Sequence, residues 1–449
     1  MTARTTAIWA IAMTAVPTSA LSAPPDEHAS NVLVVVADDL GIDKLRIYGT
    51  HPEQPATPTL DGLASQGVLF RNAWALSTCS PTRAAALTGR YPSRTGIGRA
   101  IHRPLRRELP LAEITIPEVL VHAPDSYTSA AFGKWHLSTP VSPSGLDHPL
   151  RQGFATYTGS INNLMSEGES YMQWGKVVDG TEVPWTVYAT TDTTDDAIAW
   201  VSSHAEPWFV WLAYNAPHAP LHAPPAELIG RELDDDASEL ELFNAMVEAM
   251  DTELGRLLDG LDPDVAARTT VVFLGDNGTP GFAIAPPFDA AQGKNTLFEG
   301  GVRVPLIISG PLVHTPGSTA GAMAHVVDLL PTVADIAGVP PDALPDDLDG
   351  HSLVPWLADP EQPIVREVLF AEDFRPLGPP PWGYHQLAVR NEQFKLVITE
   401  GPDDHRDETL YELGETGEGA AISGRLDRSA KRARRLLRRS LRQIRRQTR

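Results

Sequence analysis

Short apolar runs rich in β-branched and aromatic residues alternate along this chain with segments of helical periodicity. The apolar runs cover residues 32–37, 128–132, 208–212, 270–274 and 304–308. Runs of this length with few polar positions are typical of parallel strands covered on both faces. The helical pattern lies between them, at residues 59–65, 194–204, 239–261 and 325–337. This alternation predicts an α/β fold with a central, mostly parallel or mixed sheet flanked by helices.

The pattern changes after His351. Short apolar runs at residues 368–370, 386–389 and 394–398 are separated by stretches rich in Pro and Gly, such as residues 378–383. This spacing favours a small antiparallel sheet. We therefore expect a large α/β domain over residues 30–360 and a smaller C-terminal α+β subdomain over residues 361–422.

The N-terminal residues 1–23 have the composition of a signal peptide. Arg4 precedes an apolar stretch at residues 7–16, and small residues follow up to Ala23. This order predicts export to a periplasm or out of the cell, with cleavage between Ala20 and Ala23. The stretch is too short to span a membrane, and no second apolar segment follows it. The alternative is an apolar N-terminal helix of the mature fold.

Charge is distributed unevenly. The chain has 36 Lys and Arg against 57 Asp and Glu, and residues 425–449 hold twelve of the basic residues with a single acid, Asp427. The rest of the chain therefore carries 24 basic and 56 acidic residues. An acidic surface of this size disfavours nucleic acid as a partner.

The basic tail at residues 425–449 has apolar positions at helical spacing, which predicts a basic amphipathic helix. It could dock on the acidic body, contact an anionic surface such as a lipid or a polyanion, or stay solvated. Docking or solvation is favoured over membrane binding, because a basic helix is attracted to any acidic surface nearby. The apolar positions are Ala433, Leu436, Leu437, Leu441 and Ile444.

Cys79 is the only cysteine of the chain, so an intramolecular disulfide is excluded. Pro81 and the helix-forming run at residues 83–87 predict a helix that begins near Cys79. The cysteine would then lie at the positive end of the helix dipole, a suitable place for an activated or anion-facing group. The alternative is a buried structural cysteine.

Polar residues follow four of the predicted strands. Asp38 and Asp39 follow the first and Asp276 and Asn277 follow the fourth, while Lys134 and His136 follow the second and His218 the third. Ligands bind at the carboxyl ends of the strands in such sheets, so these residues are expected to form one site. Four oxygen donors suit a hard divalent cation. Each could alternatively be a helix cap or a turn residue.

These residues lie in a set of motifs that resembles the sulfatase family. The segment Cys79-x-Pro81-x-Arg83, followed by LTGR at residues 87–90, is similar to the sulfatase signature. The likeness runs from about residue 31 to about residue 413 and does not reach the basic tail. Five further segments occur in family order: NVLVVVADDLG (31–41), TPTLDGLASQGVLFRN (57–72), GKWHL (133–137), PHAP (217–220), and GDNG (275–278) with GKNTLFEGGVRVP (293–305).

The resemblance is to formylglycine-dependent type I sulfatases of the arylsulfatase kind, within the alkaline phosphatase superfamily. It implies that a formylglycine-generating enzyme oxidises Cys79 to Cα-formylglycine, an aldehyde that hydrates to a diol. One hydroxyl attacks sulfur and expels the alcohol, and the second then releases sulfate. The implied metal ion is calcium or magnesium, bound by Asp38, Asp39, Asp276, Asn277 and the oxygen of converted Cys79.

The same resemblance implies roles for the basic residues of the motifs. Arg83 would stabilise the diol, while Lys134 and Lys294 would contact sulfate oxygens. His136 would act as the base for the second hydroxyl, and His218, with Lys294, would protonate the leaving oxygen. Both histidines suit proton transfer near neutral pH. His222, four residues after His218, is expected to line the substrate pocket.

The resemblance implies a sulfate monoester of a small molecule or a sugar as substrate. The acidic body would repel long polyanions unless the basic tail recruits them. Substrate contacts are expected from residues 158–185, among them Asn162, Asn163, Tyr171 and Trp174. The first alternative is a phosphonate monoester or phosphodiester hydrolase of the same superfamily. The second, a non-enzymatic binding protein that keeps the fold, is disfavoured because every matched catalytic position holds the expected residue type.

Overall fold

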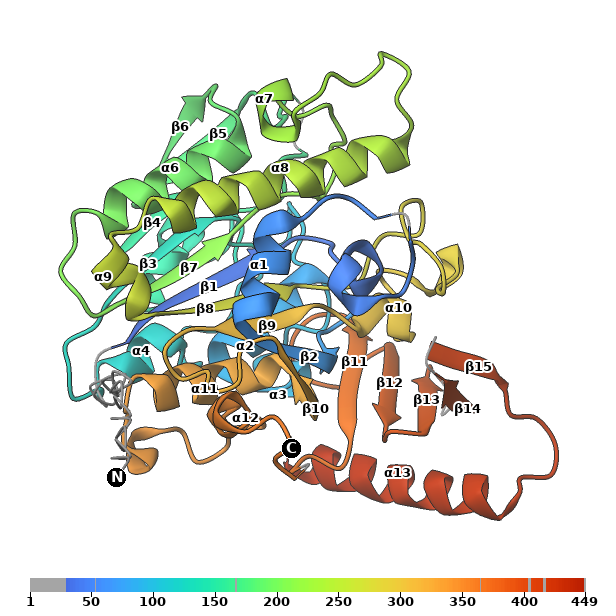
Figure 1. The fold of residues 1–449 in the computed structure, drawn as a ribbon. Helices are drawn as coiled ribbons and strands as arrows, with labels where there is room; N and C mark the ends of the chain where they lie inside the picture. The colour runs from blue at the N-terminus through green and yellow to red at the C-terminus, as the bar shows by residue number, and fades with distance from the viewer. Residues whose placement is uncertain are drawn as a thin grey trace, which may run out of the picture.

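The computed structural model describes residues 30–52, 54–165, 168–363, 365–402, 405–414 and 417–447. The signal peptide expected at residues 1–23 lies outside these ranges. The described residues form a large mixed sheet flanked by helices and a smaller antiparallel sheet near the C-terminus (Figure 1). Across these ranges, every helix is too short or too polar to cross a bilayer.

The large sheet has ten strands in the order β10-β2-β9-β8-β1-β7-β3-β4-β5-β6. Strands β8, β1, β7, β3 and β4 run parallel to one another at its centre. The predicted α/β fold is thus confirmed. The strands are β1 (Asn31–Ala37), β2 (Gly67–Trp74), β3 (Thr128–Gly133), β4 (Thr156–Gly159), β5 (Trp174–Val178), β6 (Thr181–Trp185), β7 (Trp208–Ala213), β8 (Thr269–Gly275), β9 (Leu306–Ser309) and β10 (Ser318–His325).

Helices cover both faces of the large sheet, and each face has its own apolar cluster. Side chains alternate across β1: Leu33 and Val35 pack with α1 (Pro58–Gln66), α6 (Ala189–Val201) and α8 (Glu239–Asp259). Val32 and Val34 pack on the other face with α2 (Cys79–Thr88), α4 (Ile116–Leu120) and α11 (Leu329–Ile336). This two-sided burial explains why the central strands are almost wholly apolar.

Shorter helices connect these elements. The α-helical ones are α3 (Pro92–Thr95), α5 (His148–Arg151), α7 (Ala226–Ile229), α9 (Pro263–Ala267), α10 (Glu299–Val302) and α12 (Val354–Ala358). The 3-10 helices are η1 (Ile42–Lys44), η2 (Arg46–Tyr48), η3 (Gly145–Asp147), η4 (Ala290–Gln292), η5 (Val326–Asp328) and η6 (Pro341–Ala343).

One predicted strand of the large sheet needs correction. The apolar run at residues 304–308 was expected to be parallel, but β9 begins at Leu306 and runs antiparallel to both β2 and β8. Pro305, which has no N–H to donate, precedes the first strand residue. An apolar run identifies a buried strand but does not determine its direction, which here follows from the connections around it.

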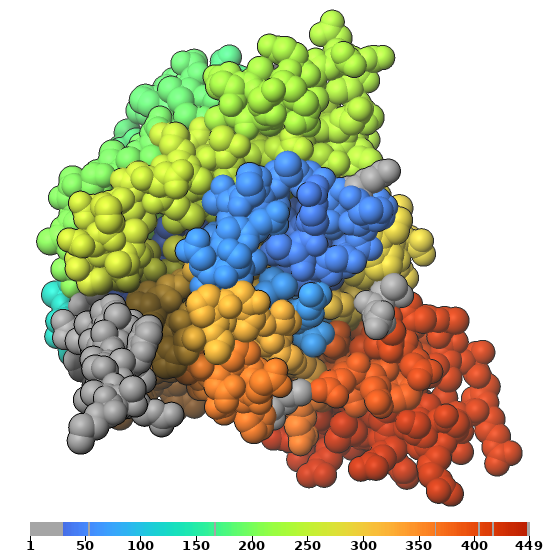
Figure 2. Space-filling view, in the orientation of Figure 1, coloured from blue at the N-terminus to red at the C-terminus, as the bar shows by residue number. Residues whose placement is uncertain are grey.

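The smaller sheet is antiparallel, as predicted, and contains two strands more than the apolar runs indicated. In the space-filling view it belongs to the C-terminal lobe that lies against the larger body (Figure 2). Apolar residues of both parts belong to one buried cluster, so the core is continuous between them. The strands are β11 (Leu369–Arg375), β12 (Tyr384–Arg390), β13 (Phe394–Glu400), β14 (Arg406–Gly414) and β15 (Gly417–Ala421).

The basic tail forms α13 (Arg428–Gln447), which packs on β12 and β13 (Figure 1). Its buried side chains include Leu437 and Leu441. Arg434 and Arg438 both pair with Glu408 of β14, at 2.6 and 2.8 Å. Of the alternatives left open by the sequence, the structure shows docking on the protein's own sheet. The exposed face of the helix carries Arg428, Arg432, Arg435, Arg439, Arg442 and Arg446.

Candidate active site

The polar motifs meet at one edge of the large sheet. Strands β8, β1, β7 and β3 are parallel neighbours, so their carboxyl ends lie together. The backbone N–H of Asp39, after β1, donates to Asp276 Oδ1, after β8, at 3.1 Å. Lys134, after β3, forms a buried ion pair with Asp38. Residues far apart in sequence are therefore in direct contact, as the order of strands and motifs predicted.

Helix α2 brings Cys79 to this edge. The helix begins at Cys79 itself, so the thiol lies at the positive end of the helix dipole. Cys79 Sγ is 3.3 Å from Asp38 Oδ1 and 3.5 Å from Lys134 Nζ. Burial, together with the charges of Asp276 and Asp38, raises the pKa of the thiol well above its usual value. The unmodified cysteine is thus a protonated thiol rather than a reactive thiolate.

Arg83 lies one helical turn after Cys79 and connects α2 to two strand ends. Its Nε and Nη2 donate to Asp276 Oδ2 at 3.0 and 2.8 Å, and its Nη1 donates to the carbonyl of Lys134 at 2.6 Å. The side chain is 1% exposed. The planar guanidinium thus forms two hydrogen bonds to a carboxylate and one to a backbone carbonyl. Together they fix the distance between α2 and the sheet edge.

The backbone is strained at this site. Among the described residues, the non-glycine positions with positive φ include Asp39 at 73°, His136 at 61° and Asn295 at 71°. Asp39 and His136 are candidate site residues, and Asn295 follows Lys294. Left-handed φ values at non-glycine residues are unfavourable and occur mainly where the surrounding structure imposes them, often at functional sites.

Gly133 is required where β3 leads into the site. Its φ is 85°, and a Cβ at this position would lie 2.0 Å from the carbonyl oxygen of Ala213. That carbonyl accepts a 2.7 Å hydrogen bond from the N–H of Lys134. The carbonyl of His136 in turn accepts from Ser80 Oγ at 2.7 Å. The Gly-Lys-Trp-His segment is therefore held between β7 and α2.

Three buried carboxylates are each paired with a cation. Besides the Lys134–Asp38 pair, Lys294 lies 2.6 Å from Asp39 and Arg83 lies 2.8 Å from Asp276. Burial favours a high pKa for Asp39, but Lys294 and His218 outweigh it and hold the pKa at about 2. Burial and the neighbouring Asp38 raise the pKa of Asp276 to about 6.

The two candidate catalytic histidines are neutral at physiological pH. Burial lowers the pKa of His218 to about 3, although Asp39 opposes the shift. Burial and the charge of Lys134 lower the pKa of His136 well below its usual value. His218 Nδ1 contacts the Ala219 carbonyl at 2.7 Å, which leaves Nε2 facing Asp39 at 3.8 Å. His136 Nδ1 is buried with no hydrogen-bond partner among the described residues.

The same edge offers donors for a metal ion. One ligand atom each from Asp38, Asp39, Cys79 and His218 lies within 4.8 Å of the others. Asn277 donates from Nδ2 to Asp39 Oδ1 at 2.8 Å, while its buried Oδ1 has no partner in the described residues. An unpartnered oxygen beside carboxylates fits a hard divalent cation, which takes oxygen ligands. His218 was not among the ligands expected from the sequence.

Several of the side chains expected to contact the substrate, within residues 158–185, form hydrogen bonds inside the protein. Tyr171 is buried, and its hydroxyl donates to the carbonyl of His218 at 2.8 Å. Trp174 is buried at the start of β5 and donates to the Val187 carbonyl. Asn162, also buried, donates to the Ser138 carbonyl at 2.9 Å. These hydrogen bonds help to fix the surrounding framework, and the substrate contacts expected from residues 158–185 stay a prediction.

His222 is held in a similar way. Its Nδ1 contacts the Pro220 carbonyl at 2.9 Å and its Nε2 contacts the Tyr188 hydroxyl at 3.1 Å. Its ring lies 4.3 Å from that of Tyr171. Both ring nitrogens of His222 thus contact the protein, and its ring packs on Tyr171, whose hydroxyl donates to the His218 carbonyl. The expected role of His222 in lining the substrate pocket stays a prediction.

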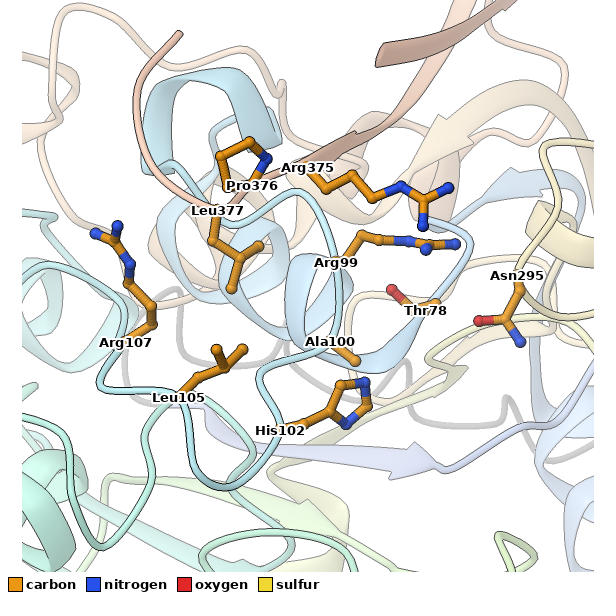
Figure 3. A pocket seen from close by; sticks show the side chains of 10 residues that line it. All are labelled: Thr78, Arg99, Ala100, His102, Leu105, Arg107, Asn295, Arg375, Pro376 and Leu377. Atoms are coloured by element: carbon orange, nitrogen blue, oxygen red, sulfur yellow. The ribbon is translucent and has the colours of Figure 1, made fainter. Parts of the chain in front are cut away.

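A cavity of about 410 Å³ adjoins the motif residues and was not expected from the sequence (Figure 3). Thr78 and Asn295, which line it, are the chain neighbours of Cys79 and Lys294. Arg99 and His102 line it from the loop after α3, and Arg375 from the end of β11. No sequence motif relates Arg375 to Cys79, since only the folded small sheet brings them together.

Comparison with known proteins agrees with this site. A family model described as Sulfatase matches residues 30–339. Arylsulfatase A from Homo sapiens is 31% identical over 435 residues, covering 87% of this chain and 78% of that protein. N-acetylgalactosamine-6-sulfatase from Homo sapiens is 31% identical over 363 residues, covering 73% of this chain and 65% of that protein.

Comparison with solved structures also gives a match over nearly the whole chain. The crystal structure of Ps i-CgsB in complex with k-i-k-neocarrahexaose has a TM-score of 0.74 and 27% identity, and the match covers 94% of this chain and 93% of that one. The family match extends over more than half of the chain, and the human relative matches most of its length. This chain therefore belongs to the sulfatase family, enzymes that hydrolyse sulfate esters.

Proposed function

We propose that this enzyme hydrolyses a sulfate monoester of a sugar to alcohol and inorganic sulfate after Cys79 has been oxidised to formylglycine. The observation that carries the proposal is the position of Cys79. It begins α2 and contacts both Asp38 and Lys134, at 3.3 and 3.5 Å from Sγ. An oxygen nucleophile at this position would face both a carboxylate cluster and a buried cation.

Asp38, Asp39, Asp276 and Asn277, with residue 79, would hold calcium or magnesium. The unpartnered Asn277 Oδ1 supports this assignment. When bound, a divalent ion lowers the pKa of a coordinated hydroxyl and so makes it a better nucleophile at neutral pH.

Lys134 and Lys294 would bind the sulfate group. Both ammonium groups are buried or nearly so, with side-chain exposures of 0% and 14%. Cations held in a region shielded from water stabilise developing negative charge far more than solvated ones do. Arg83 donates hydrogen bonds to Asp276 and to the Lys134 carbonyl. It would thereby hold the sulfate-binding lysine Lys134 in a fixed position relative to residue 79.

His136 and His218 would transfer protons. The buried, unpartnered Nδ1 of His136 can accept a proton because the neutral ring has a free nitrogen lone pair. His218 must gain a proton before it can donate one to the leaving oxygen. A bound sulfate ester adds negative charge beside His218 and thereby favours its protonated form.

The names of the relatives support a sugar as the alcohol that carries the sulfate. One is named N-acetylgalactosamine-6-sulfatase, and the structural neighbour is described in complex with k-i-k-neocarrahexaose. We also propose export through the signal peptide expected at residues 1–23, so that the mature enzyme acts in a periplasm or outside the cell.

The decisive experiment uses protein produced together with a formylglycine-generating enzyme. Mass spectrometry measures the mass of the peptide that contains Cys79, and a parallel assay measures the turnover of 4-nitrophenyl sulfate. We expect the aldehyde mass, turnover that scales with the converted fraction, and loss of turnover in Cys79→Ala. An aryl phosphodiester is the control for phosphodiesterase chemistry. Full activity in protein that carries only the free thiol would refute the mechanism, and faster turnover of the phosphodiester would refute the substrate class.

A further inference from the structure

The cavity beside Cys79 differs from the catalytic centre in its charge balance. At the centre the carboxylates of Asp38, Asp39 and Asp276 are each paired with a cation. The cavity, in contrast, is lined by Arg99, Arg107 and Arg375 and, within the part of the chain that the structure describes, by no acidic residue (Figure 3). Arg99 is paired with Asp373, at 2.8 Å. Neither Arg107 nor Arg375 forms an ion pair with a residue that the structure describes. The cavity therefore has a surplus of positive charge.

Arg375 is held so that its guanidinium edge is available. Its guanidinium lies over the Tyr384 ring, with Cζ 4.6 Å from the centroid. A cation–π contact of this kind does not use up the N–H donors of the guanidinium. Figure 3 shows the side chains of Arg375 and Arg99 extending in the same direction, toward the end of the cavity where Thr78 and Asn295 lie. A fork of N–H donors matches the geometry of a carboxylate or sulfate.

The other part of the cavity is apolar. Leu105 and Leu377 point toward each other there, next to Pro376 (Figure 3). The ring centroid of His102, which also lines the cavity, is 6.3 Å from that of His136. The cavity thus lies beside the proposed catalytic groups and has a volume of about 410 Å³. A sugar ring fits a space bounded by apolar side chains, with charged groups placed around its rim.

From this geometry we infer that the enzyme selects substrates whose alcohol carries a second oxyanion, which Arg375 and Arg99 bind while the scissile sulfate occupies the centre. The inference rests on the proposed function and specifies its substrate. The second oxyanion is a sulfate or a carboxylate on the sugar ring. Substrates of this kind are small sulfated amino sugars or sulfated hexuronates, rather than neutral sugar monosulfates.

The test compares substrate pairs that differ only in the second charge. N-sulfoglucosamine 6-sulfate is compared with N-acetylglucosamine 6-sulfate for the sulfate, and a hexuronate 2-sulfate with the corresponding hexose 2-sulfate for the carboxylate. In the wild type we expect kcat/KM to be at least about tenfold higher for the doubly charged member of one or both pairs. The pair that shows the preference identifies the second oxyanion.

Substitutions in the cavity then test whether its arginines cause the preference for the doubly charged substrate. Arg375→Gln should lower kcat/KM for the preferred substrate by about 10- to 100-fold and for its singly charged partner by less than about threefold, whereas Arg375→Lys should restore part of the loss. The control is Arg106→Gln, an exposed arginine that does not line the cavity, in the loop after α3 that carries Arg99 and His102. It should leave both values unchanged.

Calorimetry in a Cys79→Ala background gives a readout that does not depend on turnover. Tighter binding of the doubly charged sugar that is lost in Arg375→Gln supports the inference even if no sulfate is released. Equal losses for both members of a pair, an equal effect of Arg106→Gln, or a preference for the singly charged sugars would overturn it. Turnover of aryl sulfate without any charge preference would overturn the inference and leave the proposed function intact.

Discussion

The side-chain amide of Asn277 is fixed by two hydrogen bonds from its nitrogen. Nδ2 donates to Asp39 Oδ1 at 2.8 Å and to the Gly278 carbonyl at 3.0 Å, while Oδ1 is buried without a partner in the described structure. An unpaired buried polar atom costs about 1–3 kcal/mol. A cation bound to Oδ1 would recover that free energy, so we expect a substitution of Asn277 to weaken the response of the protein to metal.

The first residue-scale prediction concerns metal removal. Treatment with a chelator should abolish turnover, and calcium or magnesium should restore it. Added calcium should also raise the melting temperature of the wild type, because a ligand that binds only the folded state stabilises it. Asn277→Leu should reduce this rise, whereas Asn244→Leu, on α8, should retain it. Full turnover in protein that elemental analysis shows to be metal-free would exclude the proposed ligands.

The second concerns the two histidines. His136→Ala should release one equivalent of alcohol rapidly and then nearly stop, with no matching release of inorganic sulfate. His218→Ala should slow alcohol release itself. Loss of a general acid or base costs about 10²- to 10⁴-fold in rate. Rapid-quench kinetics that follow both products distinguish the variants, and equal slowing of both products in both variants would show that the two roles are shared or exchanged.

At the scale of elements, α10 is anchored to the small sheet through a buried carboxylate. Glu299, which starts α10, pairs with Arg390 of β12 at 2.7 Å and with Lys395 of β13 at 3.2 Å. Burial favours a high pKa for Glu299, but Arg390 and Lys395 outweigh it and hold the pKa at about 2, below the ordinary value of 4.5. Lys395 also pairs with Glu418.

This anchor predicts a pH dependence of stability. Because the folded pKa of Glu299 is depressed, its contribution is fully present above pH 4.5 and is lost as the pH falls from 4.5 toward 2. The depression corresponds to about 3 kcal/mol. Glu299→Gln should therefore destabilise the protein by about 3 kcal/mol or more at pH 7 and by much less near pH 2. Urea unfolding at several pH values measures this, with the exposed Glu412→Gln as control.

The docked helix α13 gives the second element-scale prediction. Leu437 is 0% exposed against the small sheet. Leu437→Ala should lower the free energy of unfolding by about 2–5 kcal/mol. Leu240→Ala on α8, where the side chain is 43% exposed, should change it by less than about 0.5 kcal/mol. Equal unfolding midpoints for the two variants would mean that α13 docks without stabilising the sheet.

What could be predicted from the sequence depended on how each element is stabilised. The central strands were found because burial on both faces requires continuous apolar runs. Strand β10, whose sequence is STAGAMAH, was missed because it contains small residues and only one β-branched side chain. Strand β6 was missed because much of it is exposed and its sequence lacks an apolar run.

At the scale of the whole molecule, some residues of the candidate site could be predicted from the sequence and others could not. Cys79, Lys134 and Asp276 lie in motifs beside strand ends, so both chemistry and topology pointed to them. Arg375 and Arg99 could not be found, because their neighbourhood depends on how the small sheet packs against the large domain. The centre of the site is thus encoded locally, whereas the cavity beside it arises from tertiary packing.

The arginine face of α13 also concentrates positive charge on one helix of an otherwise acidic molecule. The chain carries a formal net charge of −21 at pH 7, yet Arg432, Arg435 and Arg439 form part of an exposed basic face on one helix. A local concentration of one sign of charge steers how a protein approaches a charged surface. A cation-exchange resin should therefore retain this acidic protein at low ionic strength through α13. A positively charged surface should hold the protein in a different orientation.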